Sequence, residues 1–466
     1  MLFSSITFLY YFLPLTLILY FIAPKPLKNV VLLLSSLIFY AWGEPKCVFL
    51  MLATVALNYL LGILIEKART KIQKKVFLGI SVTATLSGLI YFKYADFFVE
   101  NFAALTGISV PALNVVLPIG ISFYTFQILS YSIDVYREDV KAQKNPLTLA
   151  TYIALFPQLI AGPIVRYADV ESQLVNRTHT FKKVSYGIKR FIFGLAKKVI
   201  LANTLGELCE AFYVTDNASI LYFWLFAISY MLQIYFDFSG YSDMAIGLGK
   251  IFGFDFLENF NYPFISKSIS EFWRRWHISL GSWFSDYVYI PMGGNRVGKS
   301  RLFINLFVVW FLTGFWHGAE WNFILWGLFF LVLLVAEKFL LVDFLRKSKV
   351  LSHIYTLFFI AISFAIFSGN GAHEAFFRVG GLFGAGGIPF FSFEFLYALR
   401  NYGFVLIISI FAATPAAKNL VLWLNKKKSI SFVLNIAEIL VLVFLLVIVT
   451  AFLVDGSFNP FLYFRF

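Results

Sequence analysis

The chain has 466 residues, of which 60% are hydrophobic, 20% are aromatic and 14% are charged, and its formal net charge is +13. An ordinary soluble domain is about 45–50% apolar, so this composition excludes a large soluble enzyme and predicts a protein whose main solvent is lipid. The lysines and arginines stand in short clusters between apolar runs, which is typical of membrane-protein loops and argues against nucleic-acid binding.

Apolar stretches of roughly membrane-spanning length, about 20 residues, recur along the whole chain. The predicted spans are 5–23, 29–43, 47–65, 75–93, 113–133, 188–205, 219–238, 302–316, 321–340, 351–369, 402–418 and 430–454. We therefore predict an all-α, polytopic transmembrane bundle of about 11–13 helices. The bundle forms a single integral-membrane domain over residues 1–466, because no long polar block separates a second one.

The basic residues alternate between the loops in a way that predicts orientation. Basic loops are expected on the inner side and loops poor in lysine and arginine, such as 94–111 and 206–218, on the outer side. The inner clusters are Lys25 and Lys28, 66–75, Arg137 to Lys144, 346–349 and Lys426 to Lys428. This pattern places both termini outside the cytoplasm. The first apolar stretch lacks the basic region of a cleaved signal peptide, so we expect it to be retained.

Two apolar stretches do not fit as full crossings. Residues 149–164 are interrupted by Pro157, Gly162 and Pro163, and residues 238–256 contain several glycines. Counting either as a crossing would put a basic segment outside. We predict that both are broken or re-entrant, which requires a protein or water-filled environment at membrane depth. Ordinary kinked core helices are the alternative.

Two of the five histidines are candidates for chemistry. His317 lies in the apolar stretch FLTGFWHGAEWNFILWG, where Gly314 and Gly318 permit close backbone approach. Ionisable groups at membrane depth usually face an interior or a cavity, and a neutral imidazole can accept and pass on a proton. A packed core histidine is the alternative. His179 lies in a polar loop and is expected to be solvated. For His353, at a helix end, and His373, in a glycine-rich loop, no catalytic role is expected either.

The second candidate, His277, lies in SISEFWRRWHISLGSWFSDYVYIPMGGNR, residues 268–296. If this segment is helical, Trp273 and Arg274 share a face with His277. Arg274 and Arg275 are expected either to extend to lipid headgroups or to attract an anionic donor. The segment lacks the Lys-Ser/Thr element of a P-loop.

Other polar groups give weaker indications. Asp237 and Asp243 lie near or within the membrane and are expected to form a proton path, a cation site or, more commonly, pairs with buried partners. Two distant cysteines, and the absence of zinc-binding spacings or a GxSxG motif, predict no metal site and no serine nucleophile.

The two histidine-containing blocks resemble the signature of membrane-bound O-acyltransferases, and in particular the bacterial branch that O-acetylates alginate and related polysaccharides. LPIGISFYTFQILSYSIDVYR, FPQLIAGPIVRY and DFSGYSDMAIGLGKIFGF resemble other blocks of that branch, so the core motif region covers about 117–327. The chain beyond about 330 is only generically hydrophobic.

The resemblance implies a histidine site inside a central membrane funnel, with His317 and His277 as the catalytic pair. It also implies acetyl transfer from a cytoplasmic donor, expected to be acetyl-CoA, towards a polysaccharide outside the cell (inner) membrane, with a secreted or anchored acetyltransferase partner and no bound cofactor. His317 is expected to act as a general base or to carry the acyl group transiently. Trp316, Trp273, Arg274, Arg275 and Asp243 are candidate substrate-binding residues.

Other functions stay open at this point. Transfer of D-alanyl or another acyl group to a cell-wall polymer uses a related block of residues. A proton-coupled transporter would use the membrane aspartates, although no inverted repeat is evident. A scaffold that only recruits a partner would not need His317.

Overall fold

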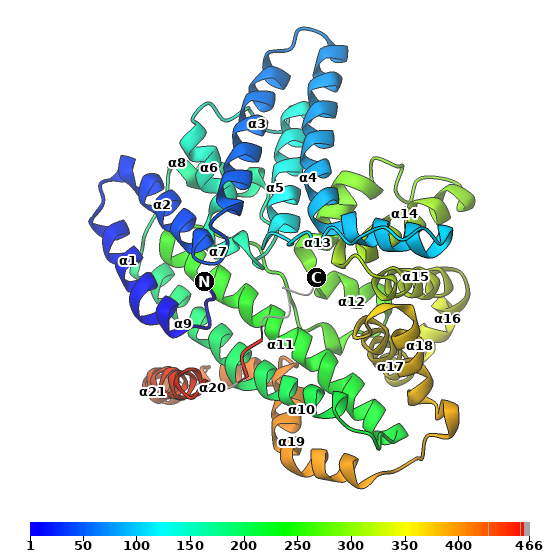
Figure 1. Ribbon diagram of the computed structural model, residues 1–466. Coiled ribbons are helices and arrows are strands. Elements are labelled where there is room, and N and C mark those ends of the chain that lie inside the picture. The colour runs from blue at the N-terminus through cyan, green and yellow to red at the C-terminus, as the bar shows by residue number, and fades with distance from the viewer. Residues whose placement is uncertain (427, 457, 461–466) are drawn as a thin grey trace. The chain divides into compact units, whose positions relative to one another are not determined.

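The computed structural model describes residues 1–426, 428–456 and 458–460, and every regular element in that part of the chain is a helix (Figure 1), which confirms the all-α class. The chain divides into two compact units. Unit 1 contains Met1–Phe191 and Met244–Leu257, and unit 2 contains Ile192–Asp243 and Glu258–Phe466. Seven of the described helices are long and apolar enough to cross a membrane: Cys47–Lys67, Lys71–Thr106, Ile220–Phe252, Trp321–Leu341, Lys349–Phe367, Phe393–Ala412 and Ile430–Val454.

Unit 1 is built from the N-terminal helices. Within it α3, α4 and α5 pack side by side, as the blue and cyan ribbons show (Figure 1). Its helices are α1 (Leu13–Ile22), α2 (Lys28–Ala41), α3 (Cys47–Lys67), α4 (Lys71–Thr106), α5 (Ile121–Arg137), α6 (Pro146–Ala154), α7 (Phe156–Leu159), α8 (Tyr167–Val175) and most of α9 (Phe181–Ala196). A π-helical turn, Phe8–Phe12, precedes α1.

Unit 2 contains both candidate histidines. In it α14 packs along α15, and α15 along α17. Its helices are α10 (Asn203–Tyr213), most of α11 (Ile220–Phe252), α12 (Ile269–Arg275), α13 (Ile278–Phe284), α14 (Lys299–His317), α15 (Trp321–Ala336), α16 (Val342–Lys347), α17 (Lys349–Phe367), α18 (Gly371–Leu382), α19 (Phe393–Ala412), α20 (Ala416–Leu424) and α21 (Lys428–Val454). Further π-helical turns are Lys197–Ala202, Ser285–Tyr289 and Glu337–Leu341.

The prediction that residues 149–164 are broken is confirmed, because α6 ends at Ala154 and only the short α7 follows. The same prediction for 238–256 is wrong, because α11 runs without a break to Phe252. Its glycines allow close packing instead. A Cβ on Gly240 would lie 2.7 Å from the carbonyl oxygen of Gly194, and small residues at such contacts let helix backbones approach.

Two other expectations are corrected. The span predicted at 113–133 begins later, at Ile121, because Pro118 and the left-handed Gly120 (φ 74°) end the extended segment before it. The span predicted at 402–418 corresponds to α19, which ends at Ala412. The basic run at Lys426–Lys428 includes residue 427, which lies outside the described residues, as does the C-terminal residue whose orientation was predicted.

Candidate functional site

A close helix crossing places His317. Gly314 on α14 meets Gly327 on α15, and a Cβ on either glycine would collide with a carbonyl oxygen of the facing helix. His317 is the last residue of α14, one turn after Gly314. Because the two backbones approach so closely there, its ring comes against Trp326 of α15, and the predicted role of Gly314 is confirmed.

The imidazole of His317 is buried among aromatic rings. Its ring centroid lies 5.0 Å from that of Trp326, 5.5 Å from that of Phe367 and 5.1 Å from that of Trp316. Gly318 then leaves room for the Phe323 ring beside the chain. The imidazole is therefore enclosed by apolar rings, and electrostatic interactions in such low-dielectric surroundings are stronger than in water.

His277 is placed by a break in the backbone. Helix α12 ends at Arg275, and His277 adopts a left-handed conformation (φ 43°, ψ 53°) before α13 begins at Ile278. The expectation that Trp273, Arg274 and His277 share one helix face is therefore wrong. A non-glycine residue in this region is strained and persists where its surroundings hold it, often at functional sites.

Asn259, in the loop after α11, holds that strained residue. Its side-chain oxygen lies 3.2 Å from Nδ1 of His277 and accepts hydrogen bonds from the Ser279 backbone N–H and hydroxyl. Its amide nitrogen donates to the hydroxyl of Ser242 at 3.1 Å. With an acceptor facing Nδ1, that nitrogen carries the proton, and Nε2 keeps its lone pair. Nε2 is buried and has no hydrogen-bond partner among the described residues.

The two histidines influence each other electrostatically. Burial, and then the charge of His317, lower the pKa of His277 well below its ordinary value. His277 also packs edge-on against Trp316, with ring centroids 6.0 Å apart, and against Phe238 at 4.6 Å. His277 is thus a neutral base at physiological pH, within electrostatic range of a second imidazole.

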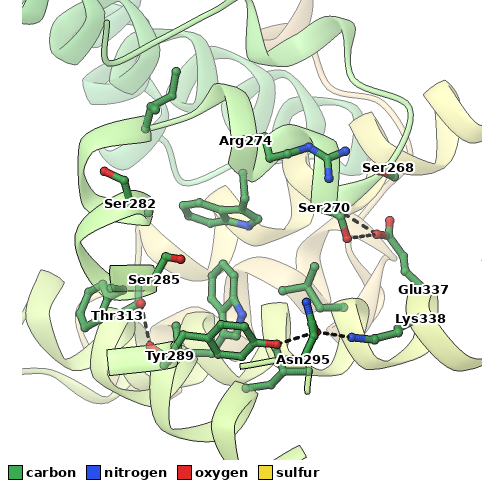
Figure 2. A pocket seen from close by; sticks show the side chains of 18 of the residues that line it. Ser268, Ser270, Arg274, Ser282, Ser285, Tyr289, Asn295, Thr313, Glu337 and Lys338 are labelled. Carbon is green, nitrogen blue, oxygen red and sulfur yellow. Dashed lines mark hydrogen bonds between the residues drawn. The ribbon is translucent and has the colours of Figure 1, made fainter. Parts of the chain in front are cut away.

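Unit 2 also contains a cavity of about 1050 Å³, whose lining includes Ile278, the residue after His277, and Thr313, one helical turn before His317, but neither histidine. Small-molecule sites usually measure about 300–1,000 Å³, so this one is large enough for an extended ligand. One wall comes from α12 and α13, and the facing wall from α14 and the segment 334–346. Figure 2 shows hydroxyls of Ser270, Ser282 and Ser285 among the side chains that line it.

The lining residues of α14 lead towards His317. Leu306, Val309, Trp310 and Thr313 line the cavity. They share one face of the helix, and His317 follows Thr313 on that face one turn later. From the opposite wall Trp273 lines the cavity and stacks edge-on with Trp310 (4.8 Å) and Trp326 (5.5 Å). The indole N–H groups of Trp273 and Trp326 are buried and have no acceptor within the described part of the chain.

The charged side chains of the cavity lining are mainly basic. Lys267, Arg274, Lys338 and Arg346 line it, while its acidic residue, Glu337, is occupied elsewhere. The Glu337 carboxylate accepts from the Ile269 backbone N–H (2.5 Å) and from the backbone N–H and hydroxyl of Ser270, which caps the start of α12. Figure 2 also shows hydrogen bonds among Tyr289, Asn295 and Lys338 at the cavity. The Tyr289 hydroxyl and the Lys338 ammonium each donate to Asn295 Oδ1 at 2.8 Å.

The other predicted site residues have different positions. Arg275 pairs with Glu271 at 3.0 Å and donates to the Asn261 carbonyl, so it braces α12 and does not line the cavity. Asp243 pairs with Lys197 at 2.7 Å, and the buried Asp237 pairs with Lys198 at 2.5 Å. These ion pairs agree with the expectation that both aspartates pair with other side chains in the protein. Trp316 is a ring neighbour of both imidazoles.

Sequence reasoning missed Asn259, Trp326 and Glu337. Asn259 lies 18 residues from His277, and Glu337 lies 67 residues from Ser270, so no local spacing relates them. Trp326 is different, because it belongs to the same apolar block as His317. Its indole N–H is a polar group within an apolar segment. A buried Trp N–H usually has a hydrogen-bond partner, so this residue was a candidate for a polar contact at the site.

Comparison with known proteins gives a consistent result. The model of the membrane-bound O-acyltransferase family matches residues 8–372. The chain is 44% identical over 394 residues to a probable alginate O-acetylase of Pseudomonas syringae pv. tomato, covering 83% of this chain and 76% of that protein.

Two further relatives have other names. A peptidoglycan O-acetyltransferase of Helicobacter pylori is 33% identical over 429 residues, which covers 83% of this chain and 81% of the relative. A teichoic acid D-alanyltransferase of Bacillus subtilis is 31% identical over 285 residues, which covers 57% of this chain and 72% of the relative.

Proposed function

Because this chain belongs to the membrane-bound O-acyltransferase family and is a multi-pass membrane O-acyltransferase, we propose that it moves an acetyl group from cytoplasmic acetyl-CoA towards an extracytoplasmic polysaccharide such as alginate. The observation that carries the proposal is the site itself. Two buried imidazoles from separate segments interact, and the same face of α14 that lines a cavity with four basic side chains also carries His317.

The cavity suits a coenzyme A thioester. Four basic side chains at the lining would attract the phosphates of the donor, and arginine and lysine are the usual phosphate-binding residues. The apolar strip along α14 would accept the pantetheine arm and direct its thioester towards His317. No cofactor is needed for this chemistry, because the thioester is already activated.

The proposed reaction is a direct acyl transfer. His317 takes the proton of the acceptor hydroxyl while the oxygen of that hydroxyl bonds to the thioester carbonyl carbon. The carbon–sulfur bond then breaks, and the leaving thiolate takes the proton from the imidazolium. General base catalysis supplies about 10²–10⁴-fold, so positioning and oxyanion stabilisation supply the rest. His277, through its unoccupied Nε2, would accept a hydrogen bond from a second donor group on the bound substrates and so orient them.

Trp273 would contribute the oxyanion donor. Its ring lines the cavity, and its N–H is buried without an acceptor in the described residues. A donor aimed at developing charge in a water-free site is worth more than the same donor in solution. In the transition state the carbonyl oxygen of the donor thioester would accept a hydrogen bond from this N–H.

The proposed location rests on the charge pattern, and the proposed partner rests on an acceptor outside the membrane. The positive-inside pattern supports the cell inner membrane, with both termini outside and residues 258–301 facing the cytoplasm, where acetyl-CoA is made. The polysaccharide would then be reached through a secreted or membrane-anchored acetyltransferase partner. The protein binds membrane lipid over its apolar helices.

D-alanyl transfer to a cell-wall polymer is the second candidate, favoured by the Bacillus subtilis relative. A transporter is not supported, since the aspartates it would use already pair with Lys197 and Lys198.

The deciding experiment follows radiolabel from acetyl-CoA into extracellular polymer, using membranes that contain the full chain and its partner. Labelled D-alanine with its activating enzymes is the parallel donor. We expect wild type to transfer acetyl label, His317→Ala and His277→Ala to transfer almost none, and His373→Ala, an exposed control, to behave as wild type. Acetyl transfer that survives His317→Ala would contradict the catalytic role, and label from D-alanine alone would support the second candidate.

A further inference from the structure

A second cluster of basic side chains lies in unit 1, where the loop before α2 meets the segment after α8. Lys28 places its ammonium 4.7 Å from the centroid of the Tyr20 ring, and the guanidinium of Arg177 lies 5.7 Å from the same centroid. The hydroxyl of Tyr20 lies 3.0 Å from Nε2 of His179. Three basic groups from two distant segments therefore surround one buried tyrosine. The expectation that His179 is simply solvated is wrong.

These cations have no carboxylate of their own. Within the described residues neither Lys28 nor Arg177 forms an ion pair, and the nearby acid Asp255 is already held by Lys183 and Lys250. Like charges held close together repel one another. Burial, and then the charge of Arg177, lower the pKa of Lys28, and burial, and then the charge of Lys28, lower that of His179.

The guanidinium of Arg177 is held in place and still lacks an acceptor. Its Nη2 donates to the side-chain oxygen of Asn29 at 2.5 Å, and its Cζ lies 4.8 Å from the centroid of the Phe254 ring. Its Nη1 is buried and has no hydrogen-bond partner in the described part of the chain. Buried donors are normally satisfied, so an open one on a fixed arginine indicates a missing acceptor.

The missing acceptor should be an anion with several oxygens. Arginine and lysine together suit a phosphate group, which accepts from both side chains and offsets their repulsion. Lys28 is half-buried and Lys25 is exposed, so the cluster is open to its surroundings through these two side chains. Both belong to a loop expected on the cytoplasmic side, where anionic headgroups attract basic residues.

We propose that Lys28 and Arg177, with Tyr20 and His179 behind them, form a binding site for a phosphate group, separate from the acyl-transfer site. An anionic phospholipid headgroup of the cytoplasmic leaflet and a soluble phosphate share this chemistry, and the membrane location of the protein favours the lipid. The ordinary alternative is that both side chains reach bulk headgroups without selecting one.

The test uses the full-length protein purified in detergent. Native mass spectrometry would measure retained phosphatidylglycerol against phosphatidylcholine, and thermal unfolding would be followed with added inorganic phosphate. The variants are Arg177→Gln and Lys28→Gln. Lys74→Gln is the matched control, since Lys74 belongs to another loop expected to be cytoplasmic but pairs with Glu138 at 2.5 Å.

We expect phosphatidylglycerol retention to fall about tenfold or more in Arg177→Gln and Lys28→Gln, and to stay unchanged in Lys74→Gln. Stabilisation of wild type, but not of Arg177→Gln, by inorganic phosphate alone would support the site and identify a soluble ligand. Equal retention in all four proteins, with no effect of phosphate, would overturn the proposal. If Arg177→Gln fails to fold, Lys28→Gln decides, because Lys28 makes no ion pair that its loss would break.

Discussion

The side-chain oxygen of Asn259 lies 3.2 Å from Nδ1 of His277, although 18 residues separate them in the chain. This contact assigns the proton to Nδ1 and leaves Nε2 as a base. It also holds a non-glycine residue in the left-handed region. Orientation and protonation of one catalytic candidate therefore depend on a residue in another loop.

Asn259→Leu should lower acetyl transfer by about a hundredfold, because a displaced catalytic group loses its productive geometry. Leucine has a similar size but cannot accept from His277 or Ser279. Ser242→Ala removes only the contact on the far side of the Asn259 amide and should cost much less. Label transfer in membranes, normalised to the amount of monodisperse protein, measures both. A similar loss in the two variants would mean that Asn259 acts only through stability.

The lowered pKa of His277 predicts how stability depends on pH. An unfolded histidine titrates near about 6.5, whereas the folded His277 stays neutral to a lower pH. Below about 6.5 the unfolded state therefore binds the proton first, so stability falls as the pH falls towards the lowered pKa. Thermal unfolding of the purified protein between neutral and acid pH should show this slope. His277→Gln should flatten it, and an unchanged slope would assign the effect to other groups.

Glu337→Gln should raise the KM for the acyl donor more than it lowers kcat. The carboxylate caps α12, which carries Trp273 and Arg274 into the cavity lining. Loss of a helix cap costs about 0.5–2 kcal/mol, which corresponds to a rise in KM between about twofold and about thirtyfold. Ser270→Ala, which removes one of the three hydrogen bonds, should give a smaller rise. A fall in kcat with unchanged KM would instead place Glu337 in the chemical step.

Trp273→Phe should lower kcat with little change in KM, if its indole N–H stabilises the oxyanion. The ring contacts remain, and only the donor is lost. Removing one such donor costs about 10²–10³-fold in other enzymes. Trp310→Phe is the matched control, because Trp310 lines the same cavity and its N–H is not among the buried donors without acceptors. Equal effects in the two variants would assign Trp273 a packing role.

Membrane character and the all-α class followed from the sequence because they depend on composition summed over long windows. The break within 149–164 was also predictable, since proline at Pro157 and Pro163 restricts the backbone locally. Gly240 misled the prediction for α11. A glycine can weaken a helix or permit a close crossing, and only the facing Gly194 decides which.

The sequence by itself pointed to His317, because an ionisable ring in an apolar segment needs a reason, and to His277 through the block of residues that resembles the family's. Only the tertiary structure decided that the two imidazoles interact and that Asn259 sets one tautomer. It also decided that Arg275 and Asp243 are held in ion pairs. These outcomes depend on contacts between distant segments, and side-chain partners across space leave no local spacing in the chain.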